Sequence, residues 1–158
     1  MSLKIFLHGL KSTNQGTKSV FFRRNYPDMI IPNLFGSLEQ RMKMLRELLA
    51  DKSDISIVGS SFGGLMATVF SMENEFRVDR MILLAPAINL LGFSRYRERK
   101  ISVPVTIFHG RNDDVIPFQP MNHVAERCFQ NLSLHIVDDD HSLHDTFSSI
   151  DWVKLLGR

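Results

Sequence analysis

Short apolar runs bounded by turn residues alternate along the chain with longer segments of helical period. The apolar runs cover residues 3–7, 29–31, 55–58, 81–85, 103–108 and 132–137. Several of them are almost continuously hydrophobic, as expected for strands covered on both faces. This alternation is typical of parallel strands joined by crossover helices, and it predicts an α/β fold.

A stripe of large apolar residues at three- and four-residue steps predicts a helix between the second and third strands. Ser37 and Gln40 have the spacing of a capping box at its start. The stripe comprises Leu38, Met42, Leu45, Leu48 and Leu49. Similar patterns predict helices over residues 65–70 and 121–128, and a last helix that uses Phe147, Ile150, Val153 and Leu156. No linker, repeat or charge block interrupts these elements, so we expect one domain over residues 1–158.

The composition is that of an ordinary globular chain. The 158 residues suffice for one domain of roughly 150 residues, and 44% hydrophobic with 23% charged residues excludes a disordered or low-complexity chain. No stretch has the ~18 uncharged apolar residues of a membrane span, and the start does not have the pattern of a signal peptide, so we expect a cytoplasmic protein. A single cysteine, Cys128, excludes an internal disulfide and a cysteine-based zinc site.

The net charge is small, with 19 Lys+Arg against 17 Asp+Glu, and it does not indicate a nucleic-acid partner. The basic residues Arg95, Arg97, Arg99 and Lys100 gather within residues 93–100. A solvated loop is the simpler interpretation, and a site for an anionic ligand or partner is the alternative.

The strongest local signal is Gly59-Ser60-Ser61-Phe62-Gly63, a G-x-S-x-G pattern that directly follows an apolar strand and precedes a helical segment. In that setting a sharp turn lifts a serine hydroxyl above the sheet, and small flanking residues let the backbones approach. Ser61 occupies the nucleophile position, whereas Ser60 has no glycine two residues to either side. The alternative is a Ser/Gly turn that only caps a helix.

A serine nucleophile needs a histidine base and an acid, and in this kind of fold the chain order is Ser, then Asp or Glu, then His. The strand over 103–108 leads to Asp113 and Asp114, and the last strand leads to His141 and His144. Both pairs follow strands, at the edge of an open α/β sheet where catalytic groups belong. The order predicts a catalytic triad, with two candidate acids and two candidate bases.

Three motifs in this order resemble those of the α/β-hydrolase superfamily, in particular its small cap-less bacterial serine esterases. They are Phe6-Leu7-His8-Gly9-Leu10, which precedes the serine turn, and His109-Gly110-Arg111-Asn112-Asp113 and Asp140-His141-Ser142, which follow it. The resemblance implies that Asp113 is the acid, with Asp114 as the fallback, and that His141 is the base. It also implies that the backbone N–H groups of Leu10 and Phe62 form the oxyanion hole.

The resemblance further implies an open, mostly parallel sheet of about six strands with helices on both faces. The chain begins at what is similar to the family's third strand, and residues 88–100 are too few for a cap domain. We expect no cofactor and no metal, because the acidic run at 138–140 is typical of a solvated turn. His8 is expected to order the first loop, and His109 to pack under the turn of the acid.

These features together predict a serine hydrolase of the carboxylesterase or thioesterase type that acts on a small or short-chain acyl ester or thioester. An anionic acyl carrier is a candidate partner through Arg95, Arg97 and Arg99. No nucleic-acid or membrane partner is expected. Two alternatives stay open: a catalytically silent binding module of the same fold, and an acyltransferase that uses the same triad.

Overall fold

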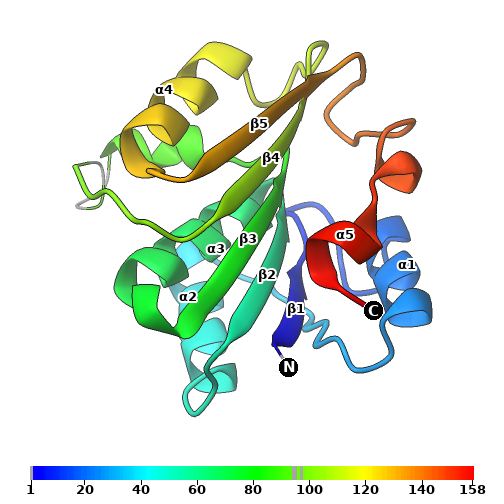
Figure 1. Ribbon diagram of the computed structural model, residues 1–158, viewed down its shortest axis with the longest axis vertical. Helices are drawn as coiled ribbons and strands as arrows, with labels where there is room; N and C mark the ends of the chain where they lie inside the picture. The colour runs from blue at the N-terminus through cyan, green and yellow to red at the C-terminus, as the bar shows by residue number, and fades with distance from the viewer. Residues whose placement is uncertain (1, 94–95, 97) are drawn as a thin grey trace.

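The fold is built on five parallel strands, as seen in the computed structural model, which describes residues 2–93, 96 and 98–158 (Figure 1). The strands pair in the order in which they occur along the chain. They are β1 (Leu3–Leu7), β2 (Ile55–Ser60), β3 (Val78–Leu84), β4 (Val105–Gly110) and β5 (Leu132–Val137). The predicted α/β class with a parallel sheet is confirmed.

The sheet has five strands in the described residues, where the sequence predicted about six. Residues 29–31 make a single bridge, between Ile30 and Ile5, instead of a ladder. Ile30 donates its N–H to Lys4 O and accepts from the N–H of Phe6, both at 2.9 Å. Pro32 has no N–H to extend the pairing, so this segment only covers the edge of β1.

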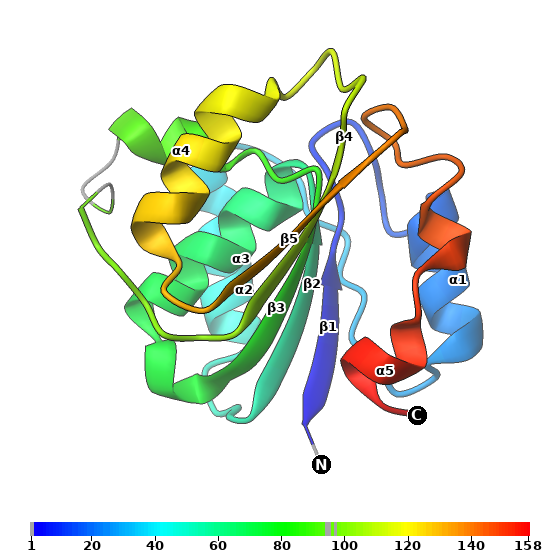
Figure 2. The same cartoon turned by 45° about the horizontal axis from the view of Figure 1, so that its top comes forward.

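Helices cover both faces of the sheet, as predicted, and Figure 2 shows the two layers. On one face lie α2 (Leu38–Leu48), α3 (Phe62–Glu73) and α4 (Phe118–Cys128). On the other face lie α1 (Thr17–Asn25) and α5 (Trp152–Leu156). Each interface encloses its own hydrophobic core, and the core under α1 and α5 contains Phe6, Phe22 and Trp152.

The helix predictions succeed where the apolar stripe is clear. The capping box of α2 is confirmed, since Ser37 Oγ accepts from the N–H of Gln40 and the Gln40 side chain accepts from the N–H of Ser37. The predicted last helix is divided into a 3-10 turn, η3 (Phe147–Ser149), and the short α5. The chain is extended at Ile150, and Asp151 caps a new helix by accepting from the N–H of Lys154.

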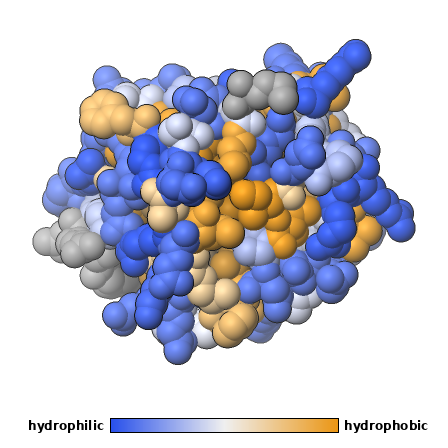
Figure 3. All heavy atoms as spheres, turned by 90° about the horizontal axis from the view of Figure 1, so that it is seen from below, coloured by the Kyte–Doolittle hydropathy of each residue, from blue (hydrophilic) through white to orange (hydrophobic). Residues whose placement is uncertain are grey.

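The surface seen from below the view of Figure 1 carries hydrophobic residues near its middle with hydrophilic ones around them (Figure 3). Apolar area of this kind is common on folded proteins and does not by itself mark a site. Among the helices of the described residues, none combines the length and the apolar character needed to cross a membrane.

Parallel pairing sends the carboxyl ends of all five strands to the same edge of the sheet. The loops that follow β1, β2, β4 and β5 therefore meet there, and they carry the residues that the sequence motifs singled out.

Candidate active site

Ser61 lies at a sharp turn between β2 and α3, with its backbone at φ 54° and ψ −115°. A positive φ is uncommon for a residue other than glycine and marks a strained turn. A Cβ at Gly59 would lie 2.5 Å from Gly63 O, and one at Gly63 would overlap the carbonyl of Leu7. The two glycines are thus required for the close approach of α3 to the sheet, and the turn exposes the Ser61 hydroxyl at the strand edge.

Three side chains from three loops form one hydrogen-bonded chain at this edge. His141 Nε2 lies 3.1 Å from Ser61 Oγ, and His141 Nδ1 lies 2.8 Å from Asp113 Oδ2. The Asp113 side chain is 1% exposed, whereas that of His141 is 24% exposed and faces the cavity. This is the arrangement of nucleophile, base and orienting acid that general-base catalysis requires.

The second oxygen of Asp113 is held by its own turn. Asp113 Oδ1 accepts from the backbone N–H of Val115 at 2.9 Å and of Ile116 at 2.8 Å. These bonds fix the carboxylate so that Oδ2 faces His141. Of the two candidate acids the structure therefore brings Asp113 to the histidine, and Asp114 is exposed to solvent. His144, the other candidate base, is likewise exposed.

The first loop presents a backbone donor beside Ser61. Gly9 O accepts from His8 Nδ1 at 2.8 Å and from the N–H of Ser12 at 3.3 Å. Because the peptide is planar and trans, holding this carbonyl turns the N–H of Leu10 the opposite way. Within the described part of the chain neither this N–H nor that of Phe62, at the start of α3, donates to a protein acceptor. Both residues line the cavity of Ser61, as an oxyanion hole requires.

The buried, neutral ring of His8 holds this loop in place through two hydrogen bonds. Its Nε2 accepts from the N–H of Leu34 at 2.8 Å, which leaves the proton on Nδ1 for Gly9 O. Burial lowers the pKa of His8 and so favours this neutral form. The expectation that His8 orders the first loop agrees with these contacts.

His109 lies under the turn of Asp113, as expected. Its ring is fully buried, and Nε2 donates to Ile116 O at 2.8 Å and lies 3.6 Å from Asp113 Oδ2. Burial lowers the pKa of His109, so the ring is neutral and adds no charge beside the acid.

Asp139 is a structural residue that the sequence did not reveal. The interpretation of residues 138–140 as a solvated turn holds for Asp138, whose side chain is 81% exposed, but is wrong for Asp139, which is 6% exposed. Its carboxylate accepts from the backbone N–H of Asp140, Asp145 and Thr146 at 2.8, 3.0 and 2.7 Å. No feature of three consecutive aspartates distinguishes the buried one in sequence.

The electrostatics of Asp139 follow from these contacts. Burial acts to raise its pKa, but hydrogen bonds from the Thr146 side chain and from three backbone N–H groups outweigh it and lower the pKa to about 2. The ionised carboxylate holds the segment after β5 in a compact turn, and His141 lies within that turn.

The cavity at Ser61 has a volume of about 490 Å³. Its lining includes the apolar residues Leu10, Phe62, Leu90, Val115 and Ile116 and the polar residues Lys11, Ser12, Thr17, Lys18 and Ser142. Lys18 Nζ donates to Ser142 O at 2.7 Å, and burial lowers the pKa of Lys18. The cavity thus offers both apolar contacts and polar groups to a bound molecule.

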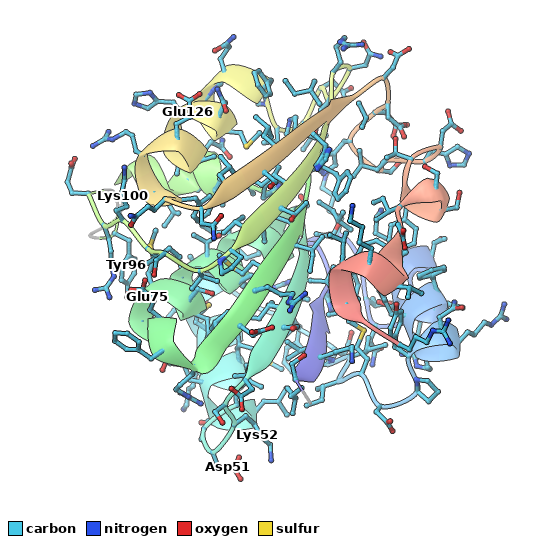
Figure 4. All side chains as sticks on the ribbon, viewed as in Figure 1. Asp51, Lys52, Glu75, Tyr96, Lys100 and Glu126 are labelled. Atoms are coloured by element: carbon cyan, nitrogen blue, oxygen red, sulfur yellow. The ribbon has the colours of Figure 1, made fainter. Side chains whose placement is uncertain are left out.

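Arg99 and Lys100, the described basic residues of the segment 93–100, are not among the residues that line this cavity. Arg95 and Arg97 fall outside the described residues. Tyr96 and Lys100, labelled in Figure 4, lie on the side of the molecule that carries Glu75. Glu75 accepts from the N–H and hydroxyl of Ser102, and these bonds, with the nearby charge of Arg99, lower its pKa. Arg99 and Lys100 therefore lie on a side of the molecule that also carries the acidic residue Glu75.

No set of three or more histidine, cysteine, aspartate or glutamate side chains in the described residues is placed to hold a metal ion. The contacts described above bring together a hydroxyl, an imidazole, a carboxylate and backbone N–H donors.

Known proteins resemble the chain in sequence pattern and in fold. Residues 15–139 match the model of the dienelactone hydrolase family. Among curated proteins the search gave no match. Solved structures similar in fold include alpha/beta hydrolase domain-containing protein 10 from mouse, with 17% identity, a TM-score of 0.76 and coverage of 90% of this chain and 82% of that one.

Two further structures show the same fold. A putative YdeN-like hydrolase from Pectobacterium atrosepticum is 20% identical with a TM-score of 0.72, over 89% of this chain and 80% of that one. Est1E from Butyrivibrio proteoclasticus, solved with ferulic acid bound, is 16% identical with a TM-score of 0.72, over 89% of this chain and 81% of that one. At these identities the likeness describes the fold.

Proposed function

The chain belongs to the dienelactone hydrolase family, within the α/β-hydrolase superfamily, and from this premise we propose that it is a serine hydrolase of carboxyl esters or thioesters. The observation that carries the proposal is the chain of contacts from Ser61 through His141 to Asp113, at 3.1 and 2.8 Å. The cavity that opens onto Ser61 gives an acyl substrate access to it.

In the first half of the reaction, Ser61 Oγ attacks the carbonyl carbon of the substrate while His141 Nε2 accepts the hydroxyl proton. Asp113 holds the imidazole through Nδ1–H and stabilises its charged form. The negative charge that develops on the carbonyl oxygen is bound by the N–H groups of Leu10 and Phe62. When the carbonyl re-forms, the bond to the alcohol or thiol breaks, and His141 returns its proton to that leaving group.

In the second half, a water molecule attacks the acyl group on Ser61 and gives a proton to His141. The tetrahedral intermediate then releases the free acid, and the proton on His141 returns to Ser61 Oγ. Both halves begin with a neutral imidazole at His141, which accepts the proton of the attacking group in each.

The substrate that best fits the site is small. A cavity of about 490 Å³ with an apolar wall accommodates a short acyl chain or a small ring. The name of the family points to cyclic esters, so lactones belong in the substrate panel with short-chain linear esters. Binding of an anionic acyl carrier by Arg95, Arg97 and Arg99 stays a prediction. Neutralising the three arginines together should weaken the binding of carrier-linked substrates and leave the binding of free esters unchanged.

The direct test combines an active-site phosphonate probe with turnover of a short-chain p-nitrophenyl ester. The wild-type protein should react with the probe and hydrolyse the ester, and Ser61→Ala should do neither. Ser60→Ala is the matched control, because it removes the neighbouring hydroxyl and should keep both activities. A folded wild-type protein that neither labels nor turns over any ester of the panel would overturn the proposal and favour a binding module.

A further inference from the structure

Arg41 on α2 is a buried arginine beside the predicted oxyanion hole. It is 4% exposed. Its Nε donates to Gly36 O at 2.9 Å, and its Nη2 lies 3.5 Å from Leu10 O. The Cζ atom lies 5.4 Å from the centre of the Phe62 ring, within the range of a cation–π contact. The guanidinium thus touches both residues whose N–H groups face the reacting carbonyl.

The Arg41 guanidinium forms no ion pair among the described residues. No carboxylate lies within 4.0 Å of it, and Nη1 is buried without a hydrogen-bond partner. Burial lowers the pKa of Arg41, but an arginine stays protonated in proteins. A buried, unpaired charge is costly for folding, and such exceptions call for an explanation in function.

We propose that Arg41 is a positioning residue for the oxyanion hole, which holds the Leu10 and Phe62 segments in place and directs a positive charge toward the negative charge of the transition state. This inference rests on the proposed hydrolase function and adds a residue to it. A carboxylate partner would cancel the field of the guanidinium at the site, so the absence of one among the described residues fits the role. Fixed charge in a dry site stabilises a developing oxyanion more than the same charge in water.

The contacts explain why an arginine suits this position. The planar guanidinium donates to Gly36 O at the entry of α2, approaches Leu10 O on the first loop, and stacks over Phe62 at the start of α3. It therefore joins three segments that are distant in sequence. A lysine carries the charge but lacks the planar fork and the face that stacks on an aromatic ring.

The test is Arg41→Met, which keeps the length of the side chain and removes its charge and donors. Lys43→Met is the matched control, since it removes one positive charge from the exposed face of the same helix. For each variant we would measure kcat and KM for the best ester, the inhibition constant of an alkyl boronic acid that forms a tetrahedral adduct on Ser61, and the affinity for an uncharged amide analogue of the ester.

Arg41→Met should lower kcat about 10-fold or more, because it loosens both oxyanion donors. It should weaken the binding of the boronic acid by the same factor. KM and the affinity for the amide analogue should stay within twofold, since the ground state does not use the oxyanion hole. Arg41→Lys should fall between the wild type and Arg41→Met, and Lys43→Met should match the wild type. A merely structural role would not separate the tetrahedral adduct from the amide analogue.

Two results would overturn the inference: a folded Arg41→Met with kcat within twofold of the wild type, or equal losses in the affinities for the boronic acid and for the amide analogue. Where Arg41→Met does not fold by circular dichroism, Arg41→Lys decides, and wild-type kcat and boronic acid affinity in that variant refute the role. Failure of the hydrolase proposal is separate, because the wild type would then show no Ser61-dependent turnover at all.

Discussion

Asp139→Asn is the substitution that most directly tests how the base is held in place. Asp139 lies two residues before His141, and one carboxylate binds three backbone N–H groups of the turn after β5. An asparagine has nearly the same shape but only one acceptor oxygen. Its amide NH₂ must face at least one of the donors that the carboxylate now accepts.

The expected loss follows from these contacts. If the amide oxygen keeps the N–H groups of Asp145 and Thr146, each of those bonds changes from a charged to a neutral acceptor and weakens by about 1 kcal/mol. The N–H of Asp140 then meets another donor, at a cost of about 1–3 kcal/mol. We expect the free energy of unfolding at pH 7 to fall by about 3–5 kcal/mol, and kcat to fall about 10-fold or more as His141 shifts.

The effect should depend on pH in a defined direction. The pKa of Asp139 is lowered from its ordinary 3.8 to about 2, so its stabilising contribution is present above the ordinary value and is lost as the pH falls toward 2. The wild type and Asp139→Asn should therefore differ most at neutral pH, and the difference should shrink between pH 4 and pH 2.

Urea denaturation followed by circular dichroism at several pH values measures this difference, and ester turnover measures the effect on His141. Asp138→Asn is the control, because that neighbouring side chain is exposed and its loss should change the stability by less than about 0.5 kcal/mol. Equal stability of the two variants at pH 7 would show that the Asp139 carboxylate does not hold the turn.

Three further outcomes are expected. Asp113→Asn should lower kcat about 10⁴-fold by disturbing the tautomer of His141, whereas Asp114→Asn should leave ester kinetics near wild type; comparable losses would reopen the choice of acid. Gly63→Ala should destabilise the fold by about 3 kcal/mol in thermal unfolding, because its Cβ meets the Leu7 carbonyl, and an unchanged melting temperature would contradict that clash. Across p-nitrophenyl esters, kcat/KM should peak at short acyl chains, and a rise toward long chains would show that the cavity does not limit the substrate.

The sequence predicted what depends on local pattern. The predicted 55–58 falls within β2, because a strand buried between two layers is marked by continuous apolar residues. The run at 132–137 coincides with β5, an edge strand that is only partly buried and whose apolar residues are interrupted by Ser133 and His135. The helix α1 was missed because Ser19 and Phe22 are its only fully buried residues, so it has no clear apolar stripe. Ser61, Asp113 and His141 were identifiable because each follows a strand within a short motif.

The remainder of the site depends on contacts that no local pattern encodes. Asp139 has the same side chain as its two neighbours, and burial alone separates it from the exposed Asp138. Arg41 lies next to Met42 in an amphipathic helix, and an arginine in such a helix is normally expected on the surface. Its burial results from the packing of the first loop and Phe62 around it, which is known only once the fold is assembled.

The pairing of each strand with its neighbour in the chain has a consequence for synthesis on the ribosome. β1 to β4 can each join the sheet as soon as they emerge, and the serine turn is complete long before His141 is made. The core under α1 and α5 forms last, because Phe6 and Phe22 pack with Trp152 and Leu156, which are synthesised much later. A nascent chain therefore exposes its aromatic face until residues 152–156 have emerged, and this interval is when chaperones have most to bind.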